Sequence, residues 1–339
     1  MVKSKQIVFT APRHVAIEER ELNQPEAEQV LIKSLFTLVS TGTELTALTG
    51  EFPQNSAWAR YVRYPFSPGY DNVGEIVALG ESAEGLKAGD KVFCWAPHCQ
   101  FALMNFKSVY KVPEDLPLKE VAFAALGQIA LNGVRLGEIA LGESIVIIGM
   151  GPVGQLALQL ARLSGGFPII AVDLSEKRLE IARSHGADLA SSSGGENLEE
   201  EIKCLTRGRM ADVVFEVTGN QKAIPRALRL LKRRGKLVIL GSPRGKVEVD
   251  FHDEVHTLGL RIIGAHNSMH TPYETPYNQW TLERDMELFL DLLRSGRITV
   301  KSLISHVFPW REAPKAYQML LEDRTQTMGV LFDWTTTKT

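Results

Sequence analysis

The sequence has 339 residues, more than one ordinary hydrophobic core supports, and it suits two domains of about 100–200 residues each. Hydrophobic residues make up 44% of the chain and charged residues 23%, a composition that excludes an intrinsically disordered protein. The chain has 38 Lys and Arg residues and 40 Asp and Glu residues, so its formal net charge is −2. It therefore lacks the excess of basic residues that would indicate a surface for nucleic acid or an anionic membrane.

The chain contains only three cysteines, Cys94, Cys99 and Cys204, which excludes a disulfide framework and indicates a reducing compartment. The first residues lack the apolar segment of a secretory signal, and no apolar run approaches the roughly 18–20 residues of a membrane span. We therefore expect a soluble, cytoplasmic protein that binds neither nucleic acid nor membrane.

Short β-branched runs dominate the first 120 residues. We expect strands at residues 29–33, 73–77 and 91–93, because each run is bounded by Gly, Pro, Asp or Ser. Gly89-Asp90 precedes the third run and is a turn signal. Many short strands joined by turns predict a small barrel or sandwich.

From about Leu118 the pattern changes to alternating helices and strands. Apolar residues recur at helical spacing in residues 118–135, and a buried-strand run at 144–148 precedes a helix at 153–163. We expect further strands at residues 169–172, 212–217, 236–240 and 260–264, with helices at 176–185 and 224–233. This alternation predicts a parallel sheet wound by βαβ crossovers.

The end of the chain returns to short strands. A helix at 282–294 ends at Ser295-Gly296, and short strands then surround a helix at 311–321. We therefore expect a nucleotide-binding domain at residues 123–296, inserted into a β domain built from residues 1–122 and 297–339.

A glycine-rich loop follows the strand at 144–148. Gly149-Met-Gly151-Pro-Val-Gly154 fits the pattern G-x-G-x-x-G and opens a helix, which is the context of a dinucleotide-binding loop. Gly149 permits the tight turn, Gly151 lets a pyrophosphate approach the backbone, and Gly154 allows close helix–strand packing. Pro152 and Val153 complete the loop at the helix N-terminus, where free N–H groups favour phosphates. The alternatives are a structural glycine turn and a methyltransferase loop that binds a nucleoside.

Asp173 ends the second predicted strand and can accept hydrogen bonds from both hydroxyls of an adenosine ribose. Because its carboxylate would repel a 2′-phosphate, we expect NAD rather than NADP. The nearby Arg178 can contact either adenine or a phosphate, so it leaves NADP open as the less favoured cofactor. We expect four residues that follow the later strands to complete the cofactor site: Thr218, Gly241, Ser242 and Ala265.

Several segments resemble the medium-chain dehydrogenase/reductase superfamily, which includes the zinc alcohol dehydrogenases. Residues 68–77, Pro-Gly-Tyr-Asp-Asn-Val-Gly-Glu-Ile-Val, resemble its P-G-H-E-x-x-G-x-V segment, and residues 85–92 resemble its G-D-x-V turn. Residues 112–116, 173–180, 186–188 and 212–219 also recur in it. The resemblance implies an α/β fold, with a Rossmann doubly wound parallel sheet inserted in a GroES-like β-barrel domain. It also implies an NAD(P)-dependent alcohol dehydrogenase or ketoreductase that forms a homodimer or homotetramer.

One branch of the superfamily is more similar than the rest. Ser40-Thr-Gly-Thr-Glu44 and the ending Gly329-Val-Leu-Phe-Asp-Trp334 resemble the group containing bacteriochlorophyllide a hydroxyethyl dehydrogenase. That similarity makes a tetrapyrrole side chain one candidate substrate.

The zinc ligands of the superfamily are replaced in this chain. Thr41 stands at the first ligand position, Tyr70 at the second, and residues 124–126 offer no acid or thiol for the third. Zinc takes thiolate, imidazole or carboxylate ligands, and three cysteines cannot hold the structural zinc of a four-cysteine lobe. We expect no metal. A rival site in Cys94, His98 and Cys99 is weakened because adjacent residues on a strand point to opposite faces.

Without zinc, hydrogen-bond donors and a proton relay must serve the reacting oxygen. By resemblance, Thr43 is the hydroxyl that contacts the substrate oxygen, although it could be a simple turn residue. Glu44 and Asp71 are candidate general bases or ion-pair partners. Tyr70 can donate to a carbonyl oxygen or merely fill space, and His98 can shuttle protons or be structural.

Residues 266–281 mix aromatic side chains with Asn, Gln, His and Glu and leave the carboxyl end of a predicted sheet strand. Aromatic rings can cover the C–H faces of a hydroxyl-rich ligand while polar groups bind its hydroxyls. We expect His266, Asn267 and Trp280 to bind substrate together with Thr41; the alternative is a subunit-contact loop.

These observations predict an oxidoreductase that transfers hydride between NAD(H) and a secondary alcohol or ketone of a polar ring substrate, namely a sugar, cyclitol or related polyol, without zinc. One alternative is a metal-free reductase of the activated C=C bonds of quinones or enones. The other is a catalytically silent NAD(H)-binding protein.

Overall fold

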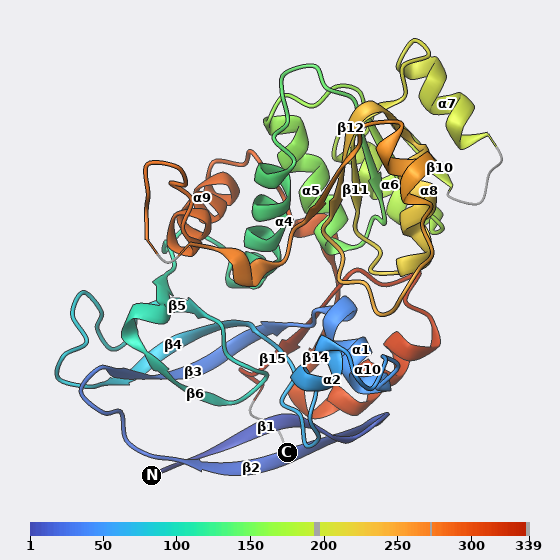
Figure 1. Cartoon of the computed structure of the whole chain (residues 1–339). Coiled ribbons are helices and arrows are strands. Elements are labelled where there is room, and N and C mark those ends of the chain that lie inside the picture. The colour runs from blue at the N-terminus through green and yellow to red at the C-terminus, as the bar shows by residue number, and fades with distance from the viewer. Residues whose placement is uncertain (193–196, 272, 337–339) are drawn as a thin grey trace. The chain divides into compact units, whose positions relative to one another are not determined.

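The computed structural model describes residues 1–192, 197–271 and 273–336 (Figure 1). Contacts divide the chain into two units, one of Met1–Leu126 with Met286–Thr339 and the other of Gly127–Asp285. The boundaries between the two units therefore lie after Leu126 and after Asp285. The boundaries expected from the sequence lie after residues 122 and 296. In the part of the chain that the structure describes, no helix is both long and apolar enough to cross a membrane.

The first unit is built on a largely antiparallel sheet. Its strand order is β14-β15-β3-β4-β5-β7, with β6 paired to β3 and a separate β1–β2 hairpin. The strands are β1 (Val2–Ala11), β2 (His14–Leu22), β3 (Gln29–Leu38), β4 (Asp71–Leu79), β5 (Lys91–Cys94), β6 (Phe101–Asn105), β7 (Val109–Lys111), β14 (Ile304–Pro309) and β15 (Gly329–Asp333). The three strands expected in the first 120 residues are present as β3, β4 and β5.

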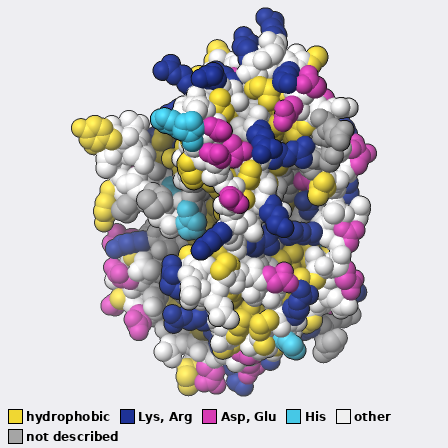
Figure 2. Space-filling model, turned by 45° about the vertical axis from the view of Figure 1, so that its right-hand side comes forward, with side chains coloured by type: hydrophobic (Ala, Val, Ile, Leu, Met, Phe, Trp, Pro, Cys, Tyr) yellow, Lys and Arg dark blue, Asp and Glu magenta, His cyan; other side chains and the backbone are white. Residues whose placement is uncertain are grey.

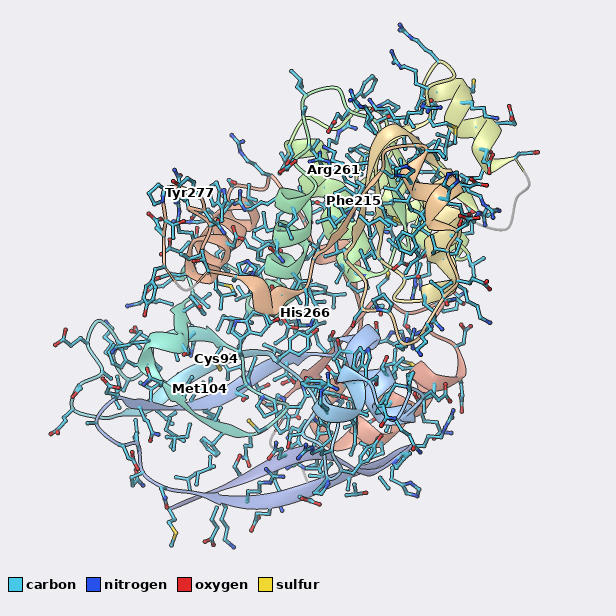
Figure 3. The ribbon with its side chains drawn as sticks, viewed as in Figure 1. Cys94, Met104, Phe215, Arg261, His266 and Tyr277 are labelled. Carbon is cyan, nitrogen blue, oxygen red and sulfur yellow. The ribbon has the colours of Figure 1, made fainter. Side chains whose placement is uncertain are left out.

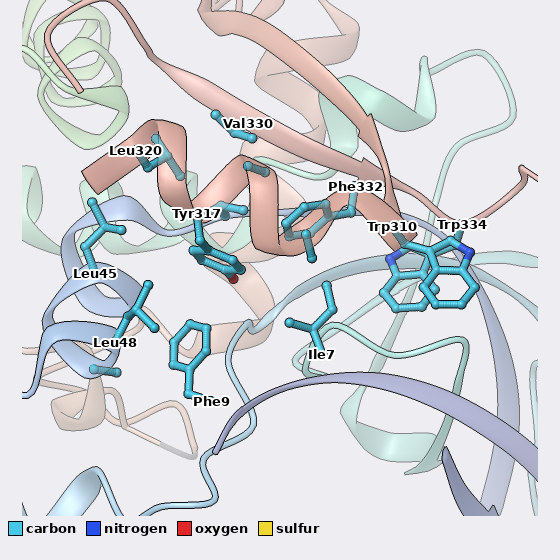
Figure 4. Close-up of a cluster of buried hydrophobic side chains, with 14 of the residues drawn as sticks. Ile7, Phe9, Leu45, Leu48, Trp310, Tyr317, Leu320, Val330, Phe332 and Trp334 are labelled. Carbon is cyan, nitrogen blue, oxygen red and sulfur yellow. The ribbon is translucent and has the colours of Figure 1, made fainter. Parts of the chain in front are cut away.

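Both ends of the chain contribute to the core of the first unit (Figure 4). Phe9 of β1 packs edge-on against Tyr317 with ring centroids 5.0 Å apart, and Trp310 stacks on Trp334 at 5.1 Å. Leu45 belongs to the same buried cluster. Because the strands β14 and β15 and the helix α10 (Ala313–Glu322) complete this core, the C-terminal return belongs to the same unit as residues 1–126.

The helix α1 (Thr41–Thr49) was not expected from the sequence. Ser40 is its N-cap, and Gly50 ends it with a φ of 68°, a left-handed conformation that suits glycine. Two further helices, α2 (Ala57–Tyr61) and α3 (Leu118–Val121), are short. The single helix expected at residues 118–135 is in fact two, α3 and α4 (Ala124–Leu136), because the chain turns at Phe123, whose N–H donates to the Glu120 carbonyl.

The second unit contains a six-stranded sheet in the order β10-β9-β8-β11-β12-β13, and each adjacent pair is parallel. The strands are β8 (Ile145–Ile148), β9 (Ile169–Asp173), β10 (Leu189–Ser192), β11 (Ala211–Glu216), β12 (Leu231–Ile239) and β13 (Arg261–Gly264). The helices are α5 (Pro152–Leu163), α6 (Glu176–Ser184), α7 (Leu198–Leu205) and α8 (Ile224–Arg229), and α9 (Leu282–Arg294) follows β13. This order is that of a Rossmann sheet, whose strand order reverses at β8.

The helix at residues 224–229 is shorter than the one expected at residues 224–233. It ends at Arg229, and Leu231 already begins β12, where it pairs with Ala211 of β11. Pairing with a neighbouring strand therefore outweighed the helical spacing of these residues. The predicted end of the second sheet strand at Asp173 is confirmed.

Candidate functional site

The glycine loop lies between β8 and α5 and shows three different backbone environments. Gly149 has a φ of 98°, and a side-chain Cβ there would lie 2.9 Å from Thr218 Cγ2. A Cβ on Gly154 would lie 1.9 Å from the Gly149 carbonyl oxygen, so this helix–loop contact requires glycine. In contrast, nothing lies within 4 Å of a Cβ built on Gly151. That open position beside the helix N-terminus fits a pyrophosphate.

The first turn of α5 supports the same function. Pro152 occupies the start of the helix, where its missing N–H leaves no hydrogen bond unmade. Gly151 provides no side-chain cap, and Val153 is half-buried in the first turn. The backbone N–H groups of this turn are therefore suited to an anion.

Asp173 is nearly buried at the end of β9, next to the glycine loop. Its carboxylate accepts hydrogen bonds from the Met150 N–H at 2.7 Å and the Ser175 N–H at 2.8 Å. Arg178 Nη1 lies 3.8 Å from the same carboxylate. Because a carboxylate can accept about four hydrogen bonds, Asp173 retains acceptor capacity for ribose hydroxyls.

The ends of β11, β12 and β13 lie at the same edge of the sheet as Gly149 and Asp173. Thr218 donates its N–H and its hydroxyl to Glu216 Oε1, the first of them at 2.8 Å. A Cβ on Gly241 would lie 2.5 Å from the Gly219 nitrogen, and Ser242 also adjoins Gly219. Ala265 is buried directly after β13.

Glu216 is a candidate that the sequence analysis missed. It is fully buried, and its Oε2 has no partner among the described residues. Burial raises its pKa despite the hydrogen bonds from Thr218. An acid directly after the apolar run Val213–Phe215 was the available signal, and its place at the ligand-binding edge fits a cofactor hydroxyl.

In the first unit, three hydroxyl groups meet at the start of α1. The Tyr70 phenol hydrogen-bonds with both the Ser40 and Thr43 hydroxyls, and its ring stacks on Trp95 with centroids 5.7 Å apart. Burial, which removes the phenol from water, raises the pKa of Tyr70 well above its ordinary value. The phenol is therefore neutral near pH 7 and can donate a hydrogen bond. Ser40 was not among the candidates, because its role depends on the unexpected helix; Thr41 is half-buried in the first turn.

Asp71 is fully buried at the start of β4. Its Oδ1 accepts the Ala125 N–H at 3.0 Å, whereas Oδ2 has no partner in the described part of the chain. Burial raises the pKa of this carboxyl well above its ordinary value, although the hydrogen bond from the Ala125 N–H lowers the pKa. No arginine partner for it is found among the described residues.

Glu44 and His98 lie together in the core of the first unit. His98 Nε2 is 3.0 Å from Glu44 Oε2, which also accepts the Tyr317 hydroxyl, and Glu44 Oε1 accepts the Ser40 N–H at 2.7 Å. His98 Nδ1 is 2.7 Å from the Thr37 hydroxyl, which accepts the Trp334 indole N–H at 3.0 Å. Both ring nitrogens of His98 therefore have protein partners, and this arrangement favours the structural alternative over a proton shuttle.

The His98 ring of the rival metal site has partners other than the two cysteines. Cys94 and Cys99 are buried in one apolar cluster, whereas the His98 ring contacts Glu44 and Thr37. Burial raises the pKa of both thiols, that of Cys99 to about 12. Among the described residues, no three or more His, Cys, Asp or Glu side chains are grouped so as to hold a metal ion.

The segment after β13 separates its expected ligand residues. His266 is exposed and bonds to the Ser268 hydroxyl at 2.7 Å, while Asn267 is half-buried. Figure 3 shows His266 and Tyr277 at different ends of the segment, and Tyr277 is almost fully exposed. Trp280 carries the Arg135 and Arg284 guanidinium groups over its ring, at 3.3 and 4.6 Å from the centroid. The indole ring therefore already makes cation–π contacts with two guanidinium groups.

Two family descriptions match consecutive parts of the chain. Residues 26–128 match the alcohol dehydrogenase GroES-like domain, and residues 152–282 match the zinc-binding dehydrogenase family. The chain belongs to the medium-chain dehydrogenase/reductase family. The predicted architecture, a Rossmann sheet inserted in a GroES-like domain, is thereby confirmed. The chain is an oxidoreductase of the alcohol dehydrogenase type.

Curated relatives act on different alcohols. D-guloside 3-dehydrogenase of Escherichia coli is 28% identical over 97% of this chain and 100% of its own length. L-threonine 3-dehydrogenase of Pyrococcus furiosus is 28% identical over 94% and 96%. Erythritol/L-threitol dehydrogenase of Mycolicibacterium smegmatis is 28% identical over 78% of each chain.

A solved structure shares the fold. Galactitol-1-phosphate dehydrogenase from Escherichia coli superimposes with a TM-score of 0.81 at 19% identity, covering 97% of this chain and 99% of the other. None of these comparisons concerns the branch of bacteriochlorophyllide a hydroxyethyl dehydrogenase, so that closer resemblance stays a prediction.

The residues at the family's zinc-ligand positions do not fit zinc. Thr41 offers only a hydroxyl, the Tyr70 phenol has a raised pKa and is bonded to Ser40, and residues 124–126 are buried and apolar. Zinc in proteins takes thiolate, imidazole or carboxylate ligands, which none of these positions supplies.

Proposed function

We propose that the protein transfers a hydride between NAD(H) and a secondary alcohol or ketone carbon of a sugar, cyclitol or other polyol, without zinc. The observation that carries this proposal is the neutral Tyr70 phenol, held by the Ser40 and Thr43 hydroxyls at the family's second zinc-ligand position. Relatives named for a guloside and for erythritol or threitol support the substrate class, while the threonine dehydrogenase marks the main competing class.

The second unit would hold the dinucleotide. Gly149, Gly151 and Gly154 with the first turn of α5 would bind its pyrophosphate, and Asp173 its adenosine ribose. Thr218, Gly241, Ser242 and Ala265 would line the other half, together with Glu216. When bound, NAD(H) supplies the hydride acceptor or donor. The Asp173 carboxylate favours NAD, because a 2′-phosphate would lie beside its charge; Arg178 at 3.8 Å is the feature that could admit NADP.

The first unit would serve the reacting oxygen. A neutral Tyr70 Oη–H can donate to a ketone oxygen and stabilise the negative charge that develops there. Thr43 would contact the same oxygen, and the three hydroxyls of Ser40, Thr43 and Tyr70 would relay the proton. Thr41 would contact substrate from the first turn of α1. Glu44 would act indirectly, by fixing the Ser40 N–H, and His98 would position Glu44.

Asp71 has a different part in this proposal. Its raised pKa favours the protonated form, and its Oδ2, which has no partner among the described residues, can donate or accept a proton. We keep it as the candidate acid of the site, in preference to Glu44, whose oxygens already accept three hydrogen bonds.

The reaction is tested by a substrate panel with NAD⁺ and NADP⁺. Purified protein should reduce NAD⁺ with gulosides, erythritol, L-threitol or galactitol, and more efficiently than with L-threonine. Tighter binding of NADPH than NADH would contradict the assignment of Asp173, and Asp173→Ser should weaken discrimination between the two. Turnover of L-threonine alone would contradict the substrate class.

A second candidate function follows from the same phenol. Tyr70 could donate to the enolate oxygen formed when an activated C=C bond is reduced. Oxidation of NADH by quinones or enones, without turnover of any alcohol or ketone, would favour that function. Tight NADH binding with no turnover on either panel would identify a catalytically silent protein.

The partner and location follow from the same reasoning. Lys, Arg, Asp and Glu side chains are interspersed on the face drawn in Figure 2, as expected for a protein whose partner is a small molecule. We propose a cytoplasmic homodimer or homotetramer, in keeping with three free cysteines.

A further inference from the structure

A polar stripe runs along one face of α4. Gln128, Asn132 and Arg135 are spaced at i, i+4 and i+7, so they share that face. Gln128 is fully buried, and the Arg135 side chain is 23% exposed. Buried polar side chains at helical spacing carry a desolvation cost unless they have partners.

Two later segments of the second unit hold this stripe in place. Arg135 Nε donates to Asp285 Oδ1 at 2.9 Å, and the Asp285 side chain is fully buried. His270 Nε2 lies 3.3 Å from the other carboxylate oxygen and 2.6 Å from Gln128 Nε2, while His270 Nδ1 is 3.0 Å from the Asn267 carbonyl. We call these six residues, including Asn132, the α4 polar cluster.

Four atoms of the α4 polar cluster are buried without a partner among the described residues: Gln128 Oε1, Asn132 Nδ2, Arg135 Nη2 and Asn267 Oδ1. Each such group costs about 1–3 kcal/mol if it stays unpaired. Two of these atoms are donors and two are acceptors. A ligand that satisfies them must therefore donate and accept hydrogen bonds at neighbouring positions, as vicinal hydroxyls do.

The charges of the cluster favour a neutral ligand. The formal charges of Arg135 and Asp285 cancel, and the neighbouring Arg284 is paired with Glu274 at 2.8 Å. A phosphate or carboxylate would therefore find no uncompensated positive charge there. The cluster also follows β13, in the half of the sheet that binds the second nucleotide of a doubly wound dinucleotide site.

We propose that the α4 polar cluster binds the vicinal hydroxyls of a neutral polyol or sugar. This inference rests on the proposed function for its substrate class. Trp280 carries the Arg135 guanidinium over its ring, so its fluorescence would report ligand binding at the cluster.

The test measures binding and turnover separately. Erythritol, galactitol and galactitol 1-phosphate are compared with 2-butanol, by thermal shift with and without NADH and by tryptophan fluorescence. Galactitol or erythritol should raise the unfolding temperature of the wild type and change the Trp280 signal, identified as the part lost in Trp280→Phe. Asn132→Leu should weaken polyol binding about tenfold, as expected for loss of one buried hydrogen bond.

The same variant distinguishes a binding role from a structural one. Asn132 Nδ2 has no partner among the described residues, so Asn132→Leu should keep or raise the unfolding temperature of the free protein, whereas loss of a structural contact would lower it. KM for the polyol should rise, with KM for 2-butanol and the affinity for NADH unchanged. Gln159→Met, a nearly buried glutamine on α5, is the matched control and should leave polyol binding unchanged. If Asn132→Leu does not fold, Asn132→Asp removes the same donor with little change in shape.

Each outcome is decisive. Polyol binding that is equal in the wild type and Asn132→Leu would overturn the inference, as would binding of none of the neutral polyols, preference for galactitol 1-phosphate, or an equal loss of NADH affinity. If the wild type binds polyols through this cluster but does not oxidise them, the inference holds and the proposed function fails. If it oxidises them with unchanged KM in the variant, the proposed function holds and the inference fails.

Discussion

The glycine loop of the second unit and the hydroxyl cluster of the first unit are built in opposite ways. Gly149, Gly151 and Gly154 lie within six positions of one another, and their function depends on backbone conformation and on the absence of side chains. The environment of Tyr70 instead depends on side chains from distant segments; Glu44 and Tyr317, for example, are 273 positions apart. A local motif can therefore reveal the first region, whereas the second appears only after the chain has folded.

The largest effect is expected at the hydroxyl cluster. Tyr70→Phe removes the donor proposed for the reacting oxygen, and loss of one such donor costs on the order of 10²–10³ in turnover, or about 3–4 kcal/mol. NADH affinity should stay unchanged, because the glycine loop lies in the other unit. Steady-state kinetics and NADH titration check this.

Tyr64→Phe is the matched control for this variant. The Tyr64 hydroxyl donates to the Ala47 carbonyl, so its loss should affect stability and leave turnover nearly unchanged. Thr43→Val should lower turnover in the same direction as Tyr70→Phe. Wild-type turnover in both Tyr70→Phe and Thr43→Val would refute the hydroxyl relay.

Two alanine substitutions sharpen the account of the glycine loop. Gly154→Ala places a methyl group 1.9 Å from the Gly149 carbonyl oxygen and should lower both stability, by about 1–3 kcal/mol or more, and NADH affinity. Gly151→Ala meets no protein atom within 4 Å, so it should preserve the unfolding temperature while weakening NADH binding. Denaturant unfolding and NADH titration measure the two effects. Normal NADH affinity in Gly151→Ala would contradict the phosphate site.

A smaller effect is expected at Tyr317, which contacts the hydroxyl cluster only through Glu44. Its buried hydroxyl donates to Glu44, so Tyr317→Phe should lower the free energy of unfolding by about 1–3 kcal/mol. Turnover should fall less than in Tyr70→Phe, because Glu44 keeps its bonds to Ser40 and His98. A loss of turnover as large as that of Tyr70→Phe would place Glu44 in the chemistry itself.

The smallest effect is a pH dependence at Asp71. Its folded-state pKa lies above the unfolded value, so its contribution to stability is complete below the unfolded pKa and is lost as pH rises through the folded pKa. Asp71→Asn mimics the neutral acid and cannot ionise. From about pH 4 upward, the wild type should therefore lose stability relative to Asp71→Asn.

Asp90 is a control because its pKa is shifted in the opposite direction to that of Asp71. Although burial raises the pKa of Asp90, Lys111 and the Lys87 N–H hold it below the ordinary value. Its contribution is therefore present above the unfolded pKa and lost as pH falls through the folded pKa. Asp90→Asn should be less stable than the wild type near pH 7 and approach it in acid. Unfolding curves over a pH series compare each variant with the wild type. If the stability of Asp71→Asn and of the wild type changed with pH in parallel, the raised pKa of Asp71 would be contradicted.

Features that depend on local sequence could be predicted, whereas features that depend on tertiary contacts could not. Hydrophobic runs located β8, β9 and β11, because a parallel strand that is buried on both faces is mostly apolar. The glycine pattern and Asp173 could be placed because their spacing is local. Helix α1 was missed because its first turn, Thr-Gly-Thr-Glu, has little helical propensity and is fixed by Ser40, Glu44 and their tertiary partners. The orphan oxygen of Glu216 and the partners of His98 are tertiary contacts that no local pattern encodes.

Zinc content and turnover, measured on one preparation before and after chelation, decide whether the reaction depends on zinc. Purified protein should contain well under one zinc per chain. Its reduction of NAD⁺ with a polyol should survive chelation and should not be stimulated by added zinc. Stoichiometric zinc that is lost together with activity, and whose return restores activity, would contradict a reaction without zinc.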